Sequence, residues 1–362
     1  MAELVIENVS KKFMGKTALD NVSLTIHDKL FTTIFGNAGA GKTTLLRIIA
    51  GVEKPDKGKI YLNGKDITTF LPKDRNIAMV YQSFALYPHM TVYDNIANPL
   101  RARKMTKSQI DEKVNQISKS LGIQELLSRY PRELSGGQAQ RVAIARSLVR
   151  DADVYLLDEP LTNLDYKIRE GMREELKKMC KDFSATLVYA SPDPLDALAM
   201  ADRVAVMSDG KLLQYGPTKD VYYTPNDITV ATIFGTPPIN VLNAYAKEMD
   251  GHLYLETPLF KADVTKHKEK LSPNKEYKVG IRPHHLAISK RKVEVEMTSF
   301  LAELHLTHVV GAETICYARS NGEEITIHVP YIYRMEGLEQ VYIYFNPEHL
   351  LVFDKDTGLR VT

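Results

Sequence analysis

The sequence predicts two domains of different class: an α/β domain with a mostly parallel sheet, and behind it a smaller all-β domain. Apolar strand patterns at residues 30–35, 154–157 and 186–189 alternate with helical patterns. This alternation is typical of a parallel sheet with crossover helices. After Thr236-Pro237-Pro238 the long helical periodicity disappears and short β-rich runs dominate. We therefore place the two domains at residues 1–235 and 236–362.

Three helices are expected in the first domain. One follows a glycine-rich turn and covers residues 43–50, and another covers residues 140–149. The third begins at Thr106, which forms a capping box with Gln109, and Gly122 ends it. Its apolar positions recur at helical spacing and predict one buried face: Ile110, Val114, Ile117 and Leu121.

Bulk composition is that of an ordinary globular protein, with 44% hydrophobic and 25% charged residues. A net charge of +2 is too small to indicate nucleic acid or an anionic membrane as the main partner. Cys180 and Cys316 lack metal-type spacing and are expected to be reduced thiols of a cytosolic protein. The N-terminal residues do not form a signal-peptide pattern. No apolar run approaches the roughly 20 residues that cross a bilayer, so any membrane spanning is expected from other chains.

A phosphate-binding loop stands between the first buried strand and the first helix. The pattern G-x-x-x-x-G-K-[ST] is matched by Gly36-Asn37-Ala38-Gly39-Ala40-Gly41-Lys42-Thr43. Its glycines let backbone N–H groups point at phosphate oxygens, and the helix N-terminus adds a positive dipole. Lys42 is expected to reach the β- and γ-phosphates, and the Thr43 hydroxyl is expected to bind Mg²⁺.

Two acids, Asp158 and Glu159, follow the apolar strand at residues 154–157. Alone, such a pair is more often a loop start or a helix cap, but the phosphate loop upstream favours a catalytic interpretation. Asp158 would hold Mg²⁺ through water. Glu159 would orient or deprotonate the attacking water, which contributes about 10²–10⁴ in rate.

The pentapeptide Leu134-Ser135-Gly136-Gly137-Gln138 decides the class. A serine and two glycines that open a helix form a second anion site. Here the sequence resembles the ATP-binding-cassette family, whose signature is this pentapeptide. The resemblance implies that the signature of one subunit closes over the γ-phosphate of a nucleotide held by the opposite subunit, in a head-to-tail dimer.

The same resemblance implies further site residues. Gln82 matches the loop glutamine that senses Mg²⁺ and the transmembrane partner, and Thr44 continues the nucleotide contacts of the phosphate loop. Phe13 matches the aromatic residue that stacks on adenine, although an ordinary packed aromatic is the alternative. Leu164-Asp165 resembles the loop that contacts the opposite subunit. Residues 81–100 match a groove that receives a short helix of the membrane subunit, and core packing is expected there as well.

The C-terminal part narrows the resemblance to sugar- and polyol-importer ATPases with an OB-like tail that serves dimer contacts and regulation. Its matching segments are 280–286, 310–314 and 353–359. The implied fold is a P-loop NTPase cassette, with a helical subdomain at about residues 84–150, followed by a small all-β OB-like domain. The adjacent His284 and His285 are interpreted as surface polar residues rather than metal ligands.

The implied function is ATP hydrolysis that powers import of a carbohydrate or a polyol, such as glycerol, through a membrane transporter. ATP and Mg²⁺ are the implied cofactors. Expected partners are transmembrane permease subunits, a second ATPase subunit and, indirectly, a solute-binding protein. Nucleic acid is not an expected partner. The chain is expected to be peripheral, at the cytoplasmic face of the membrane. A non-catalytic regulatory subunit and a non-transport cassette ATPase are the alternatives.

One position departs from the family pattern. The family's switch motif Tyr-x-Thr-His-Asp aligns without gaps to Tyr189-Ala190-Ser191-Pro192-Asp193, so Pro192 stands where the histidine is expected. Proline has neither a side-chain donor nor a backbone N–H. Losing one preorganised donor lowers the rate by about 10²–10³. The chain then either pairs with a different ATPase that keeps its histidine or forms a homodimer that works without it.

Overall fold

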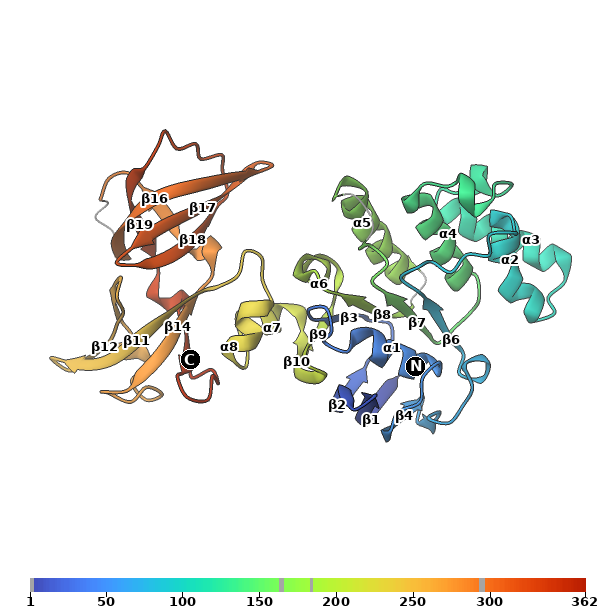
Figure 1. Ribbon diagram of the computed structural model, residues 1–362, viewed down its shortest axis with the longest axis horizontal. Helices are drawn as coiled ribbons and strands as arrows, with labels where there is room; N and C mark the ends of the chain where they lie inside the picture. The colour runs from blue at the N-terminus through green and yellow to red at the C-terminus, as the bar shows by residue number, and fades with distance from the viewer. Residues whose placement is uncertain (1–2, 163–165, 183–184, 293–296) are drawn as a thin grey trace. The chain divides into compact units, whose positions relative to one another are not determined.

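The computed structural model describes residues 3–162, 166–182, 185–292 and 297–362. The chain divides into two compact units, one reaching Val221 and the other beginning at Tyr222 (Figure 1). This division precedes the change of pattern at Thr236, because residues of α8 (Ile228–Ile233) pack with the β-rich part. Ala231 of this helix shares a buried cluster with Ile239 and Phe353.

A six-stranded sheet forms the centre of the first unit, in the order β10-β9-β3-β8-β7-β6. All neighbouring strands pair in parallel except β9 and β10. The expected parallel α/β sheet is therefore confirmed. The strands are β3 (Phe31–Phe35), β6 (Ile77–Val80), β7 (Val154–Asp158), β8 (Thr186–Ser191), β9 (Arg203–Ser208) and β10 (Lys211–Pro217).

Side chains alternate along each buried strand, so both faces of this sheet present apolar residues that helices cover. One face packs Ile34, Leu156 and Val188 against α1 (Lys42–Ala50). The opposite face packs Phe31, Leu157 and Leu187 against α5 (Tyr166–Asp182). The unit also contains the shorter helix α6 (Pro194–Met200), a 3₁₀ turn at Pro72–Asp74 and the start of α7 (Thr218–Tyr223), whose last two residues belong to the second unit.

A second, antiparallel sheet belongs to the same unit and has the order β2-β1-β4-β5. Its apolar side chains, including Leu4, Ile6 and Leu19, join the buried cluster that contains α1. This sheet therefore lies on the α1 side of the central sheet. Its strands are β1 (Leu4–Phe13), β2 (Lys16–Ile26), β4 (Lys57–Leu62) and β5 (Lys65–Asp66).

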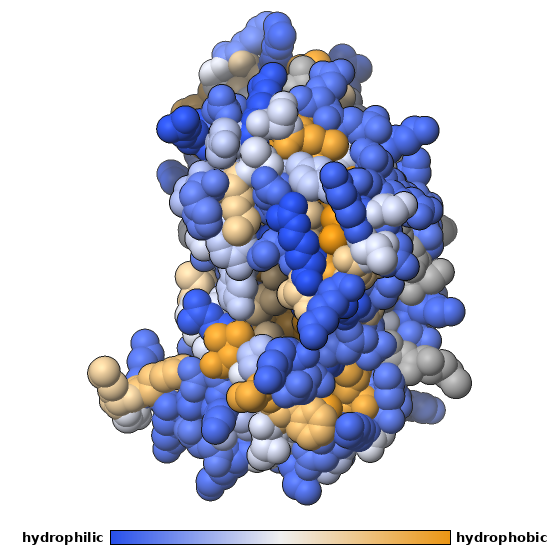
Figure 2. Space-filling view, turned by 90° about the vertical axis from the view of Figure 1, so that its right-hand side faces the viewer, coloured by the Kyte–Doolittle hydropathy of each residue, from blue (hydrophilic) through white to orange (hydrophobic). Residues whose placement is uncertain are grey.

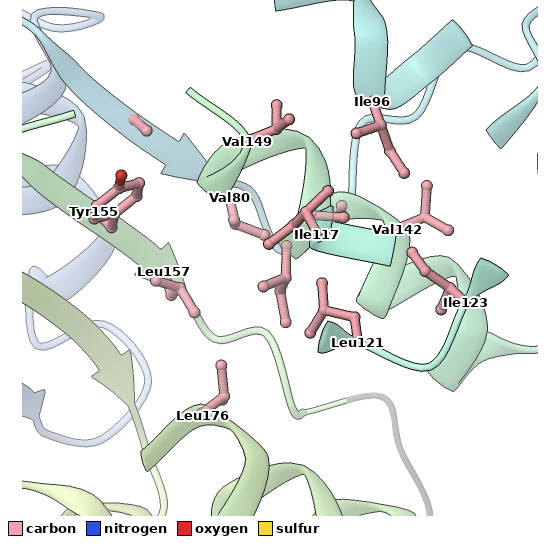
Figure 3. Packing of buried hydrophobic residues seen from close by; sticks show 14 of the residues in the cluster. Val80, Ile96, Ile117, Leu121, Ile123, Val142, Val149, Tyr155, Leu157 and Leu176 are labelled. Atoms are coloured by element: carbon pink, nitrogen blue, oxygen red, sulfur yellow. The ribbon is translucent and has the colours of Figure 1, made fainter. Parts of the chain in front are cut away.

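Helices fill the stretch between β6 and β7. They are α2 (Val92–Ala102), α3 (Lys107–Ser120) and α4 (Gly136–Leu148), with 3₁₀ turns at Gln124–Leu126 and Pro131–Glu133. Thr106 and Gln109 form the predicted capping box, and the four predicted apolar positions of α3 are buried. Figure 3 shows Ile117 of α3 and Val142 of α4 pointing into one core, near Val80 and Leu157 of the central sheet.

The start of α4 differs from expectation. The helix was expected at residues 140–149, but it begins at Gly136, so that both signature glycines lie in its first turn. Ser135 is the N-cap, and it forms a capping box with Gln138. These two reciprocal hydrogen bonds satisfy free N–H groups of the first turn, which outweighs the low helix propensity of glycine.

The second unit contains two five-stranded sheets, and every strand pair in them is antiparallel. Leu253 and Val279 of one sheet share a buried core with Leu304, Ile325 and Val341 of the other. The predicted β character of this part is confirmed, while its relation to the OB fold stays a prediction.

The first of these sheets has the order β13-β12-β11-β14-β20 and contains β11 (Asn240–Met249), β12 (His252–Glu256), β13 (Lys261–Asp263), β14 (Glu276–Ile281) and β20 (Leu351–Asp354). The second has the order β15-β19-β16-β17-β18 and contains β15 (Ala287–Ser289), β16 (Thr298–Val310), β17 (Glu313–Ser320), β18 (Glu323–Val329) and β19 (Glu339–Phe345). Short 3₁₀ turns lie at Thr265–His267, Pro283–His285 and Pro347–His349.

Hydrophilic residues cover most of the face seen in Figure 2, and the hydrophobic patches on it are separated from one another. Across the described ranges, no helix has the length and the apolar character needed to cross a bilayer. Cys180 and Cys316 are buried and free, and burial raises the pKa of each thiol to about 11. Both side chains are therefore protonated thiols at neutral pH.

Candidate functional site

The glycine-rich loop at residues 36–41 connects β3 to α1, and close packing requires glycine at positions 36 and 41. A Cβ on Gly36 would lie 2.3 Å from the Met207 carbonyl oxygen. Gly41 has a φ of 98°, and a Cβ there would lie 2.5 Å from the Ala18 carbonyl oxygen. The loop can therefore wrap tightly around the N-terminus of α1, where free N–H groups and the helix dipole favour an anion.

A pocket of about 370 Å³ opens at this loop. Its volume lies within the range of small-molecule binding sites. Gly36, Asn37 and Ala40 are not among its lining residues, and Gly36 and Ala40 are buried. The lining consists of Phe13, Lys16, Thr17, Ala18, Ala38, Gly39, Gly41, Lys42, Thr43, Thr44 and Glu159.

Some of these lining residues were not predicted. Lys16, Thr17 and Ala18 begin β2, and Phe13 ends β1, where it pairs with Lys16 across the hairpin. No sequence motif marks the three residues, but their place three to five positions after Phe13 follows from the hairpin. Phe13 is 42% exposed, as a stacking surface requires and a packed core residue does not. The ammonium of Lys11 lies 5.2 Å from its ring centroid.

Lys42 is buried, and its ammonium is held by three oxygen atoms. It donates to the carbonyl oxygens of Gly36 at 2.8 Å and Asn37 at 3.2 Å. It also forms an ion pair with Glu159, with Nζ and Oε1 3.1 Å apart. The charge on Lys42 is thus fixed at the floor of the pocket, and a phosphate that approaches it has to compete with the carboxylate of Glu159.

Thr43 and Asp158 present oxygen atoms side by side. The Thr43 hydroxyl donates to Oδ1 of Asp158 at 2.9 Å. Burial raises the pKa of the Asp158 carboxyl above its ordinary value, although the Thr43 hydrogen bond acts in the opposite direction. A hydroxyl beside a desolvated carboxylate is an oxygen donor set that suits Mg²⁺, which typically takes one or two carboxylates together with waters and phosphate oxygens. These residues therefore fit a magnesium ion.

Glu159 follows the last residue of β7 in a left-handed conformation, with a φ of 47°. Its N–H donates to the Ala190 carbonyl of β8 at 3.1 Å. A non-glycine residue in this region is uncommon, and strained residues of this kind cluster at functional sites. The strain turns the Glu159 side chain into the pocket, where it meets Lys42.

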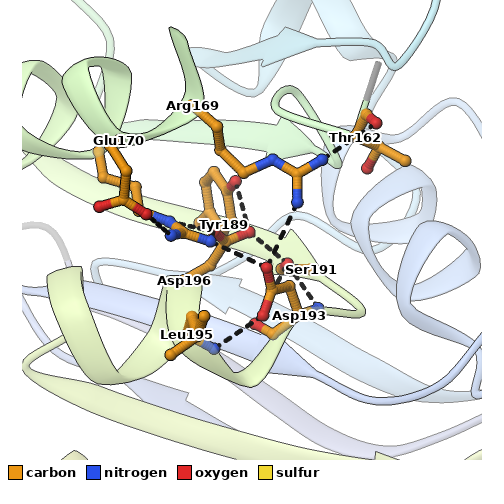
Figure 4. Close-up of polar contacts among 9 residues, drawn as sticks. Thr162, Arg169, Glu170, Tyr189, Ser191, Asp193, Leu195 and Asp196 are labelled. Atoms are coloured by element: carbon orange, nitrogen blue, oxygen red, sulfur yellow. Dashed lines mark hydrogen bonds and ion pairs between the residues drawn. The ribbon is translucent and has the colours of Figure 1, made fainter. Parts of the chain in front are cut away.

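A buried polar network lies at the end of β8 (Figure 4). The hydroxyls of Tyr189 and Ser191 both donate to Oδ2 of Asp196, at 3.0 and 2.5 Å. Arg173 of α5 donates to Oδ1 of Asp196 at 2.7 Å and to Asp193 at 2.9 Å. The roles of Arg173 and Asp196 were missed, because their meeting depends on how α5 and α6 pack.

The comparisons with known proteins agree with this geometry. A family model described as ABC transporter matches residues 19–162. The chain is 40% identical to the trehalose/maltose import ATP-binding protein MalK of Thermococcus litoralis, over 100% of both chains. It is 39% identical to the oligosaccharides import ATP-binding protein MsmX of Bacillus subtilis, again over 100% of both. The chain belongs to the ABC transporter family.

Solved structures match the cassette part. The cbiO1 protein of Clostridium perfringens, part of the ABC transporter complex cbiONQ, matches with a TM-score of 0.56 and 29% identity, over 60% of this chain and 89% of that one. The ATP-binding cassette MJ0796, solved as a dimer in a post-hydrolysis state, matches with a TM-score of 0.54 and 31% identity, over 59% and 98%. As an ABC ATPase, the chain uses ATP as its nucleotide.

Two predicted parts of the ABC site do not line the pocket. Gln82 follows β6 and is exposed, and it does not line the described pocket. The signature residues Ser135, Gly136, Gly137 and Gln138 sit at the N-terminus of α4 and do not line it either. Leu164-Asp165 lies outside the described residues. The pocket in this chain is thus built from the β1–β2 hairpin, the phosphate loop, α1 and Glu159.

Proposed function

We propose that this chain hydrolyses ATP to power the import of a carbohydrate or a polyol as a subunit of a membrane ABC transporter. The observation that carries the chemistry is the meeting of Lys42, Thr43 and Glu159 at one pocket, with the buried Asp158 hydrogen-bonded to Thr43 behind the lining. The import role is supported by the relatives MalK and MsmX, both named as import ATP-binding proteins and both aligned over their whole length.

The roles of the pocket residues follow from their chemistry. Lys42 and the N–H groups of the phosphate loop bind the β- and γ-phosphates, and Phe13 stacks on the adenine. Thr43 and Asp158, with Gln82 from the loop after β6, would hold Mg²⁺, and the ion would supply positive charge to the phosphate oxygens. Glu159 orients or deprotonates the attacking water once the phosphate has drawn Lys42 away from it.

The signature completes a site on a second subunit in this proposal. Ser135 and Gly136 are exposed at the N-terminus of α4, outside the pocket of their own chain, while Gly137 is buried. This position supports a head-to-tail pair in which each signature faces the partner's nucleotide. The matching cassette MJ0796 is described as dimeric, which is in keeping with such a pair.

A surface beside α2 and α4 is the proposed docking site for a membrane permease subunit. A hollow of about 160 Å³ is lined by Met79, Tyr87, Pro99, Arg146 and Arg150, among others. Tyr87 is exposed there, whereas Val92 of the same stretch belongs to the core. The region thus combines exposed side chains, which support the proposed docking, with core packing. Docking there would hold the chain at the cytoplasmic face of the membrane, and a solute-binding protein would act on it only indirectly.

The test measures ATP turnover by the purified chain and then by the chain assembled with its permease subunits in vesicles. We expect turnover that Glu159→Gln abolishes and that a transported carbohydrate or polyol stimulates. Glu175→Gln is a matched control, because Glu175 is ion-paired with Arg141 at 2.7 Å away from the pocket. Turnover equal in wild type and Glu159→Gln would reject the proposed site, and carbohydrate-independent turnover in the assembly would reject the import role.

Pro192 favours a second, asymmetric form of this function. It follows Ser191 at the end of β8 and offers no hydrogen-bond donor to the nucleotide site. In this form the chain pairs with a different ATPase, completes that partner's site through Ser135–Gln138, and contributes little turnover itself. The chain alone would then bind ATP without hydrolysing it, and hydrolysis would appear only on addition of the partner ATPase.

A further inference from the structure

The end of β8 connects the two halves of the nucleotide pocket. The Gly36 N–H, at the start of the phosphate loop, donates to the Ser191 carbonyl at 3.3 Å. The Glu159 N–H donates to the neighbouring Ala190 carbonyl at 3.1 Å. Two consecutive carbonyls of β8 thus accept hydrogen bonds from the phosphate loop, which leads to Lys42, and from the backbone of Glu159. Any shift of this strand end changes the spacing between them.

The position of Ser191 is itself fixed by the hydrogen bonds of its buried side chain. Its hydroxyl donates to Oδ2 of Asp196 at 2.5 Å and accepts from the Asp193 N–H at 3.0 Å. Figure 4 shows the Ser191 side chain turned toward Asp196. With one hydrogen donated and one accepted, the hydroxyl has a single favoured orientation.

Asp196 is a rigid anchor for this hydroxyl. It is buried, and both of its carboxylate oxygens are occupied, Oδ1 by Arg173 and Oδ2 by Tyr189 and Ser191. Burial, with a further contribution from Asp196, raises the pKa of Tyr189 well above its ordinary value, so that the phenol stays a donor. Buried polar networks in which every member is satisfied rigidify their surroundings.

We propose that Ser191 is a positioning residue for ATP hydrolysis, which sets the spacing between Lys42 and Glu159 through its hydrogen bond to the Asp196–Arg173 pair. This inference rests on the proposed function of Glu159 in the same pocket. The Ser191 hydroxyl contacts Asp196 and not the pocket, and it acts by fixing the strand end whose carbonyls accept from Gly36 and Glu159. Lys42 keeps its hydrogen bonds to the Gly36 and Asn37 carbonyls inside the loop, so the effect is expected on the chemical step.

The test compares Ser191→Ala with Ser191→Thr in the transporter assembled from this chain and its permease subunits. Misplacement of catalytic groups by about 1 Å lowers rates by up to about 10²-fold. We expect Ser191→Ala to lower kcat by roughly tenfold or more, with the Kd for ATP measured in EDTA changed less than about twofold. Ser191→Thr keeps the hydroxyl and should restore most of kcat.

Ser208→Ala is the matched control. Ser208 ends β9, which is separated from β8 by β3 in the same sheet, and its hydroxyl donates to Asp209 rather than to the buried network. It should leave kcat and Kd unchanged. Thermal melting of each variant distinguishes a loss of stability from a changed Lys42–Glu159 distance. A purely structural role would lower the melting temperature and ATP binding along with kcat. In that case Ser191→Thr would not selectively restore kcat.

The outcomes separate the two proposals. A kcat for Ser191→Ala within twofold of wild type, or a parallel loss of ATP binding, overturns the positioning role while Glu159→Gln still abolishes turnover. Wild-type turnover that Glu159→Gln leaves unchanged overturns the proposed site itself. A selective loss of kcat that Ser191→Thr repairs supports the positioning role.

Discussion

Lys42 and Glu159 form an ion pair with 3.1 Å between Nζ and Oε1, inside the pocket built by the phosphate loop. The Lys42 ammonium and the Glu159 carboxylate have to separate when a phosphate binds Lys42. The pair therefore competes with the nucleotide, and the carboxylate also repels the phosphate charge directly.

Glu159→Gln is therefore expected to tighten ATP binding while it removes turnover. Loss of one negative charge beside Lys42 should lower the Kd for ATP by about five- to tenfold, which corresponds to roughly 1–1.4 kcal/mol. Equilibrium titration with ATP in EDTA measures this without hydrolysis. Glu159→Ala should act in the same direction, and weaker ATP binding in both variants would contradict the competition.

Two Gly→Ala variants distinguish the effect of a steric clash from the effect of backbone strain on stability and ATP binding. Gly36→Ala places a Cβ 2.3 Å from the Met207 carbonyl oxygen, so the phosphate loop has to move. We expect a stability loss of about 1–3 kcal/mol and at least tenfold weaker ATP binding, since the loop N–H groups lose their alignment.

Gly64→Ala is the control for this pair. Gly64 has a φ of +77°, and a Cβ there would meet no heavy atom within 4 Å. The change should lower the free energy of unfolding by about 1–2 kcal/mol through strain alone and leave the Kd for ATP unchanged. Denaturant unfolding and ATP titration of both variants provide the measurement, and equal ATP affinity in Gly36→Ala and wild type would contradict the packing argument.

Local patterns predicted the elements that carry the site, because their causes are local. The phosphate loop between β3 and α1, the acids at the end of β7 and the capping box at Thr106 each depend on residues a few positions apart. The start of α4 was also within reach of the sequence, since Ser135 and Gln138 have capping-box spacing. Two glycines at positions 136 and 137 favoured a loop on propensity alone, and the reciprocal hydrogen bonds reversed that preference.

The network at Ser191 could not be predicted in the same way. Arg173 lies 23 residues before Asp196 in sequence, and their contact depends on how α5 and α6 pack at the end of β8. The ion pair of Lys42 with Glu159 likewise depends on the left-handed turn at Glu159, which no glycine or asparagine marks. Sequence spacing indicates which groups reach one edge of the sheet, but their mutual distances arise from tertiary packing.

The stability of the second unit should fall in acid partly through His285. Its ring stacks on His349 with centroids 4.0 Å apart and lies 4.3 Å from His284. Burial, and then the neighbouring charges of His284, His349 and Arg282, lower the pKa of His285 from its ordinary 6.5 to about 4. Between these values the unfolded chain binds the proton more readily than the folded one, so stability rises with pH.

His285 therefore contributes its full stabilisation above pH 6.5 and loses it progressively as the pH falls toward 4. The melting temperature of His285→Gln should approach that of wild type, or exceed it, as the pH is lowered through this window. His308→Gln, at an exposed position on β16, is the control and should keep a constant difference from wild type. A constant difference for His285→Gln as well would contradict the assignment.

Restoring a donor at position 192 should raise turnover. Pro192 follows Ser191, whose carbonyl contacts Gly36 of the phosphate loop, so a side chain at this position starts beside the nucleotide site. The Asp193 N–H and the Ser191 hydroxyl keep their hydrogen bond whatever side chain stands between them. If the missing donor limits this chain, Pro192→His should raise its kcat for ATP by about 10²–10³-fold.

The measurement uses the purified chain alone, so that a partner ATPase does not mask the effect. Pro192→Ala removes the ring without adding a donor and should leave turnover at the wild-type level. A comparable gain in both variants would assign the effect to the proline ring and not to the lost donor. Fast turnover in wild type with no gain in Pro192→His would show that the chain works without this contact, and would favour a homodimer over the asymmetric pair.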